Sequence, residues 1–193
     1  MLFVPSIIAF GVIVAAYVNL GAKLATLRHD GVLKRIRTTP LPASAYLSGV
    51  LASTAATTLA ITASIMAIGA IAFHAVPRIS GLPEIGGGLV LGVVCFGALG
   101  VALSSLARSA ESASPIANAS YLPIAIMSGI FDPTFSVPRW LSVVVGLLPV
   151  RALAQILQQG YTPVEHAPIS DLFVLLAWTA IGCALAAWRF RWQ

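Results

Sequence analysis

The residue types that carry out covalent or metal chemistry are few in this chain and are scattered. His29, His74 and His166 lie far apart, and no serine stands in a Gly-x-Ser-x-Gly turn. No glycine-rich loop ends in Lys-Ser or Lys-Thr, so the chain lacks that route to holding nucleotide phosphates. Cys95 and Cys183 each lie in an apolar run with no Cys or His at ligand spacing, which favours buried inert thiols over a disulfide or a metal site. We therefore expect no catalytic residue, no bound cofactor and no metal centre in this chain.

Charge is concentrated in a basic segment that runs from Lys23 to Pro40. It contains five of the 11 lysines and arginines of the chain: Lys23, Arg28, Lys34, Arg35 and Arg37. Uncharged runs precede and follow it, at residues 2–20 and 41–73. Positively charged residues in short loops between membrane segments are retained in the cytosol. The segment therefore predicts a cytosolic loop, placed at about residues 23–40.

Within this loop, apolar and basic side chains alternate as they do on a short amphipathic helix. Val32, Leu33 and Ile36 would share one helical face, and the basic side chains would point elsewhere. Gly31 before them and Pro40 after them delimit about two helical turns. Orientation in a membrane needs only some of these charges, so the pattern also suits docking of a soluble partner.

The composition predicts a membrane protein. The chain is 59% hydrophobic and 9% charged, with a mean hydropathy of +0.95, whereas a soluble domain is about a quarter charged. The basic residues gather at the ends of apolar runs rather than on a soluble face, so the sequence pI of 9.8 does not indicate nucleic-acid binding. Abundant Ala, Gly and Val, together with many more arginines than lysines, suggest a GC-rich bacterial genome.

Five apolar runs approach the roughly 20 residues that a helix needs to cross a bilayer. They are residues 2–20, 43–73, 85–107, 115–131 and 172–188. The expected fold is therefore an all-α polytopic membrane protein that forms one domain, residues 1–193. Between Arg139 and Arg151 lie only eleven uncharged residues, interrupted by Pro149. Because an arginine at mid-depth costs about 2.5–3.5 kcal/mol, residues 137–157 predict a short re-entrant or interfacial hairpin rather than a crossing.

Five crossings with the basic loop inside give a clear charge bias. Eight basic residues fall inside (Lys23, Arg28, Lys34, Arg35, Arg37, Arg108, Arg189, Arg191) and three outside (Arg78, Arg139, Arg151). This orientation places Met1 outside without a preceding positive residue. We therefore expect that at least one upstream span is missing from the chain.

The polar residues of the second apolar run allow two interpretations. Thr54, Thr57, Thr58 and Thr62 share one helical face. Their hydroxyls could bond back to their own helix or could line a path for a polar substrate. The small-residue pairs Gly88/Gly92 and Gly100/Ser104 indicate helix-packing faces. The spans contain no ionisable group at mid-depth, which argues against a proton- or sodium-coupled carrier.

Two patches of the chain resemble type-2 ATP-binding-cassette (ABC) exporter permeases. Residues 28–41 resemble the cytosolic loop of that family, where an Arg-acid-x-Gly run leads through a basic, hydrophobic helix into Thr-Pro-Leu. Residues 128–151 resemble the family's Ser-Gly-x-Phe and Pro-x-Trp-Leu motifs and its proline-rich re-entrant region. The chain departs from the family pattern in having His29 at the position of the usual acid, with Asp30 following. It also lacks the family's first interfacial helix and first span.

The resemblance implies a permease subunit that exports a drug or antibiotic, a lipid or a glycolipid across the bacterial cytoplasmic membrane. It implies two permease chains, as a homo- or heterodimer, and soluble ABC ATPase subunits that bind ATP and Mg. The implied partner-coupling residues are Arg28, Asp30, Gly31, Leu33, Lys34, Arg35, Ile36 and Arg37. A substrate path would include Thr54, Thr57, Thr58, Ser128 and Phe131. A non-transporting membrane scaffold and a secondary transporter are the alternatives, and a neighbouring ATPase gene would argue against both.

Overall fold

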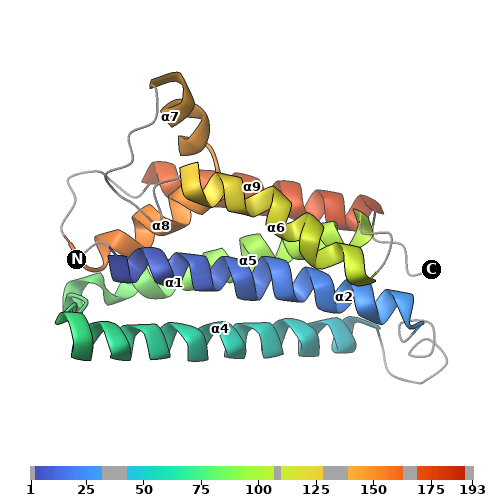
Figure 1. The fold of residues 1–193 in the computed structure, drawn as a ribbon, viewed down its shortest axis with the longest axis horizontal. Coiled ribbons are helices and arrows are strands. Elements are labelled where there is room, and N and C mark those ends of the chain that lie inside the picture. Colours follow the sequence, from blue (N-terminus) through green and yellow to red (C-terminus); the bar gives the residue numbers. More distant parts are fainter. Residues whose placement is uncertain (1–2, 32–42, 107–109, 128–138, 163–168, 190–193) are drawn as a thin grey trace.

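The computed structural model describes residues 3–31, 43–106, 110–127, 139–162 and 169–189, and the structural statements below concern these residues (Figure 1). Nearly all of this part of the chain is helical, and it contains no strand. The long helices lie along the length of the molecule, as Figure 1 shows. The predicted all-α class is therefore confirmed.

The first long helix is continuous and has three parts: α1, Phe3–Ile13; η1, Val14–Asn19; and α2, Leu20–His29. We call all three together the first membrane helix. Its middle part, η1, is π-helical, a wider turn that is often found at functional sites. The helix includes residues 23–29, which the sequence had assigned to the loop. It ends at Gly31, whose φ of 67° is a left-handed conformation that glycine adopts without strain.

The other elements complete a helical bundle. They are α4, Ala43–Phe73; η2, Ile79–Gly81; α5, Leu82–Leu106; α6, Ala110–Met127; α7, Arg139–Gly146; α8, Pro149–Gln159; and α9, Ile169–Arg189. The long helices alternate in direction between two ends of the bundle (Figure 1). We call the end at which α2 terminates the basic end, because Lys23 and Arg28 lie near it, and the other the distal end. At the basic end α4 and α6 begin and α5 and α9 end.

Four described helical segments are long and apolar enough to cross a membrane. They are Phe3–His29, Ser48–Phe73, Ile79–Ser105 and Ile169–Trp188. The predicted polytopic membrane fold is therefore confirmed. The predicted span 115–131 corresponds, in its described part, to α6, which runs between the same two ends but contains Pro115 and Pro123 and is not one of the four. The total of five crossings stays a prediction.

Helix α5 is the centre of the bundle and packs against the first membrane helix, α8 and α9. Small residues allow this close packing. A Cβ added at Gly100 would meet the backbone oxygen of Ala16 at 2.8 Å, so α5 approaches the π-helical turn at backbone distance. Gly88 and Gly92 face α8, where an added Cβ would meet the side chains of Ile156 and Leu153 at 2.9 Å. The prediction that these glycines form helix-packing faces is confirmed.

Two short helices, α7 and α8, precede α9. Leu147 and Leu148 form the turn between them, and Pro149 begins α8 at a position where its missing N–H costs no helical hydrogen bond. One side of α8 is buried in the bundle, where Leu153 and Leu157 are fully covered. Helix α7 instead projects from the bundle (Figure 1). The predicted hairpin region is thus a pair of short helices, and its depth in a membrane stays a prediction.

Candidate functional site

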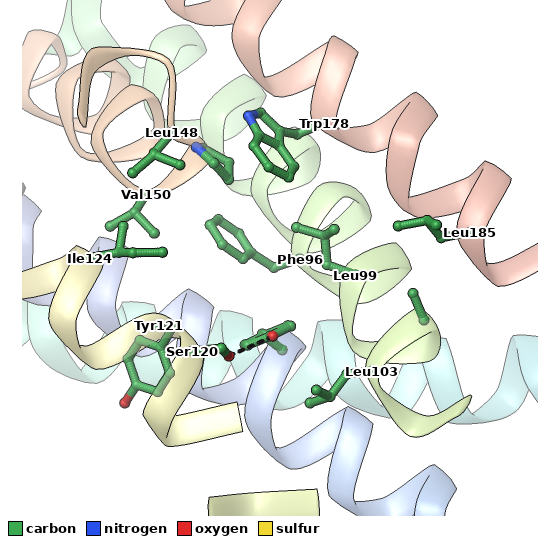
Figure 2. A pocket seen from close by; sticks show the side chains of 13 residues that line it. Phe96, Leu99, Leu103, Ser120, Tyr121, Ile124, Leu148, Val150, Trp178 and Leu185 are labelled. Atoms are coloured by element: carbon green, nitrogen blue, oxygen red, sulfur yellow. Dashed lines mark hydrogen bonds between the residues drawn. The ribbon is translucent and has the colours of Figure 1, made fainter. Parts of the chain in front are cut away.

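A cavity of about 250 Å³ lies between the first membrane helix, α5, α6, the start of α8 and α9 (Figure 2). We call it the apolar cavity. Its lining contains four aromatic rings, several aliphatic side chains and no charged group. The lining residues are Tyr17, Phe96, Leu99, Ala102, Leu103, Ser120, Tyr121, Ile124, Leu148, Pro149, Val150, Trp178 and Leu185.

Two polar side chains of the cavity wall, Tyr17 and Ser120, are hydrogen-bonded to each other. The hydroxyl of Tyr17, on η1, lies 2.8 Å from Ser120 Oγ of α6 (Figure 2). Ser120 Oγ gives its single hydrogen to the carbonyl of Ala117 at 2.7 Å, so the Tyr17 hydroxyl is the donor to Ser120. The ring of Tyr121 meets that of Tyr17 edge-on, with centroids 6.4 Å apart. The wall therefore offers a ligand mostly carbon surface.

Trp178 connects α9 to the hairpin on the opposite wall of the cavity. Its Nε1 donates to the carbonyl of Leu147 at 2.8 Å, in the turn between α7 and α8. The residues that follow this turn, Leu148 to Val150, form part of the lining. A movement of the hairpin would therefore change the shape of the apolar cavity.

The apolar cavity suits an uncharged apolar or aromatic group. Apolar surface that leaves water gains about 25 cal/mol per Å², whereas an unpaired charge in such a place is strongly disfavoured. Binding pockets for whole drug-sized molecules are usually about 300–1,000 Å³, so this cavity suits one portion of such a molecule. The arrangement can bind an apolar group reversibly, and it offers no nucleophile or acid–base pair.

The predicted substrate-path threonines lie on α4, away from the apolar cavity. Their hydroxyls donate to carbonyls one turn earlier: Thr54 to Val50 at 3.0 Å, Thr57 to Ser53 at 2.9 Å and Thr58 to Thr54 at 2.8 Å. The back-bonding interpretation of these hydroxyls is therefore confirmed. Thr54 and Thr57 also border a smaller, polar cavity, whereas Thr58 is buried. Ser128 and Phe131 lie outside the described residues, and a substrate path along these positions stays a prediction.

The predicted coupling residues are described only in part. Leu33, Lys34, Arg35, Ile36 and Arg37 lie outside the described residues. Arg28 lies in the last turn of α2, and its Nη1 donates to the carbonyl of Ser104 at 2.9 Å. Asp30 and Gly31 follow as the cap of the helix. Arg28 therefore joins the start of the predicted coupling segment to the end of α5, whose side chains line the apolar cavity.

At the distal end, the connection between α4 and α5 is held against the end of α8. Arg78 donates through Nη2 to the carbonyl of Gln159 at 2.9 Å and through its backbone N–H to the carbonyl of Gly160 at 3.0 Å. Three buried polar atoms in this part of the fold have no hydrogen-bond partner among the described residues: Arg78 Nε, Glu84 Oε2 and the Tyr161 hydroxyl. Burial raises the pKa of Tyr161, so the phenol stays protonated at neutral pH. This end is polar but tightly packed.

Sequence reasoning missed the residues of the apolar cavity. All of them except Ser120 are ordinary apolar or aromatic residues of apolar runs, and they come from five separate elements. One signal was present: Tyr17, Ser120 and Trp178 carry polar groups inside or beside long apolar stretches. Such groups need partners in a membrane protein, so they could have indicated contacts between helices.

The long apolar helices define a polytopic α-helical membrane domain, and the apolar cavity lies between them. The family model described as ABC-2 type transporter matches residues 1–161, and the chain therefore belongs to the ABC-2 type transporter family. It is an ABC permease subunit, as its resemblance in sequence implied. A comparison with curated proteins found no match.

Proposed function

We propose that this chain is the permease subunit of an exporter, which moves a hydrophobic or amphipathic substrate out across the bacterial cytoplasmic membrane. A drug or antibiotic, a lipid or a glycolipid has the required apolar part. The observation that carries the proposal is the uncharged, aromatic cavity of about 250 Å³ between the long helices. Its location within a permease supports the entry of an apolar group directly from the bilayer.

Energy would come from a separate soluble ABC ATPase that binds ATP and Mg. In our proposal it docks on the basic segment, through Leu33, Lys34, Arg35, Ile36 and Arg37. The hydrogen bond from Arg28 to Ser104 supports this route, because it links that segment to α5. ATP-driven displacement of the segment would thereby alter the wall of the apolar cavity.

A second permease chain, identical or different, would complete the transporter. Helices α4 and α9 leave most of their surface uncovered within one chain, since only 17% and 11% of their apolar windows are buried. These faces are available to membrane lipid and to a second permease chain.

Co-expression of the chain with an ABC ATPase, chosen as one that co-purifies with it, tests the proposal. ATP hydrolysis is measured in phosphatidylcholine liposomes with and without Nile red, a neutral apolar probe. We expect the permease to stimulate the ATPase and Nile red to increase that stimulation. An ATPase that is unaffected by the permease would contradict the proposed function.

A pair of substitutions on α5 locates the effect. Ala102→Phe fills the apolar cavity from its lining and should remove the response to Nile red. Val90→Phe adds a ring on the same helix where the side chain is 65% exposed, and it should leave that response intact. Equal responses of the two variants would exclude the apolar cavity as the site of the probe.

A further inference from the structure

The second cavity, of about 110 Å³, lies between the first membrane helix and α4, toward the basic end. We call it the polar cavity. It is lined by Ala15, Asn19, Leu20, Lys23, Ser53, Thr54 and Thr57. Asn19, Lys23, Ser53 and Thr57 are exposed, so the cavity opens on the surface of the bundle. Since a water molecule takes about 30 Å³, the cavity has room for a group the size of a phosphate or a carboxylate.

Most hydroxyl hydrogens in the polar cavity are already used. Ser53 and Thr54 donate to the carbonyl of Val50, each at 3.0 Å, and Thr57 donates to that of Ser53 at 2.9 Å. A hydroxyl has one hydrogen, so these three groups face the cavity as acceptors. The remaining side-chain donors of the lining are the Lys23 ammonium and the Asn19 amide.

The charge of the polar cavity is uncompensated by its own lining. Lys23 is its charged residue, and no carboxylate is among the side chains that border it. Lys23 belongs to a helix of membrane-crossing length and lies near its end, where a lysine side chain can reach the headgroup region. An anion of the right size would supply the negative charge that the lining of the polar cavity lacks.

The position of the polar cavity indicates the source of such an anion. The face of α4 that borders it belongs to a helix of membrane-crossing length of which only 17% of the apolar window is buried, so a lipid beside α4 can reach the opening. Lys23 lies within two turns of the end of α2, at the basic end of the bundle. An anionic group would therefore arrive on an apolar tail, from the leaflet on that side.

We propose that the polar cavity binds the phosphate or carboxylate headgroup of an anionic amphipathic molecule from the leaflet at the basic end. Lys23 Nζ and the Asn19 amide donate to the headgroup oxygens, and Thr57 Oγ1 accepts from a headgroup hydroxyl. The tail lies along the exposed apolar surface of α4. The inference rests on the proposed function only for its direction, because an exporter takes its substrate from the cytosolic leaflet.

Native mass spectrometry of the purified chain tests the binding step without the ATPase. The probes are phosphatidylglycerol and phosphatidylcholine with the same acyl chains, present in equal amounts. A charged hydrogen bond contributes about 1.5 kcal/mol or more, so we expect a preference of about tenfold for the anionic lipid. Lys23→Gln should remove the preference, and Lys23→Arg should retain it. Equal binding of both lipids by the unmodified chain would overturn the proposal.

Two variants of α4 distinguish a loss of binding in the polar cavity from general damage to the fold. Thr57→Phe blocks the polar cavity while keeping Lys23, and it should also remove the preference. Ser64→Ala deletes a hydroxyl that bonds the carbonyl of Ala60 on the same helix but does not border the cavity, and it should leave the preference unchanged. If Thr57→Phe keeps the full preference, the anion binds elsewhere and the proposal is wrong.

A transport assay distinguishes the two sources of this headgroup chemistry. Phosphatidylglycerol with a fluorescent acyl chain is placed in liposomes that contain the chain and its co-purifying ATPase, and exposure of the probe is followed with dithionite. ATP-dependent movement identifies the bound lipid as cargo, and binding without movement identifies a resident lipid. Stimulation of the ATPase in pure phosphatidylcholine tests the proposed function separately, so either proposal can fail alone.

Discussion

At the scale of single residues, Gly100 is the position where α5 approaches the backbone of η1. A Cβ at this position would lie 2.8 Å from the backbone oxygen of Ala16 and 3.0 Å from that of Tyr17. Both atoms belong to backbone that has no alternative rotamer, so Gly100→Ala must separate α5 from η1. Overpacking of this kind costs about 1–3 kcal/mol, although alanine is the better helix former. We expect a clearly lower melting temperature in detergent.

Gly97 is the matched control for this prediction. It lies one turn earlier on α5, and a Cβ there would meet side-chain atoms at 3.7 Å or more, which is ordinary van der Waals distance. Gly97→Ala should therefore leave the melting temperature unchanged or raise it slightly. If both substitutions lowered it equally, the contact with η1 would not be the reason.

The sequence could predict some of these residue roles and not others. Small-residue spacing indicated the packing roles of Gly88, Gly92 and Gly100, because the spacing of each pair, Gly88/Gly92 and Gly100/Ser104, places two small residues on one helix face. The threonines of α4 were open to two interpretations, since the sequence cannot show where a hydroxyl hydrogen goes. The lining of the apolar cavity could not be predicted, because its residues meet only after five elements have packed.

At the scale of elements, a side-chain hydrogen bond from Trp178 joins α9 to the turn of the hairpin. Trp178→Phe keeps an aromatic ring at the cavity wall but removes the Nε1–H that bonds the carbonyl of Leu147. We expect the turn at Leu147 and Leu148 to open more often. Amide hydrogen exchange in the peptide containing α7 and the start of α8 should become faster by several-fold, since a hydrogen bond is worth about 1 kcal/mol net. Exchange in α4 should stay the same.

The basic segment is the element that we expect to meet the ATPase. Leu33→Asp together with Ile36→Asp would place two carboxylates on the predicted apolar face, so the co-purifying ATPase should be lost from the complex. Insertion should survive, because Lys23 and Arg28 still orient the chain. The control pair is Val76→Asp with Ile79→Asp, which alters two exposed apolar residues at the distal end. Retention of the ATPase by the Leu33/Ile36 variant would refute the docking role.

Element boundaries followed from the sequence where a chemical stop signal was present. The apolar run 43–73 coincides with α4, because His74 and the residues after it leave the helix. The first membrane helix continued past the predicted end at residue 20, because a single lysine does not break a helix and the first glycine stop is Gly31. The charged residues therefore predicted which side of the membrane the segment faces, but they did not predict where the first membrane helix ends.

At the scale of the whole molecule, the direction of each helix supports the orientation predicted from charge. Lys23 and Arg28 lie near the basic end, whereas Arg78 and Arg151 belong to the distal connection and to α8. Together with the wider bias of the sequence, this distribution agrees with the prediction that the basic end faces the cytosol. Helix α6 lies between α5 and α9 in the chain, so the orientation of α9 depends on whether α6 crosses the membrane.

Cysteine labelling across α6 tests this topology. Cys95 and Cys183 are first replaced by alanine, and single cysteines are introduced at exposed positions Ser80, Glu111 and Ser170. Ser80 precedes α5 at the distal end, Glu111 begins α6 at the basic end, and Ser170 begins α9 at the distal end.

An impermeant thiol reagent added outside intact cells should label Ser80→Cys and Ser170→Cys. Glu111→Cys should react only after the cells are opened, because α6 then separates two sides of the membrane. If Glu111→Cys and Ser170→Cys react from the same side, α6 does not cross, and α9 must be reversed relative to the basic segment.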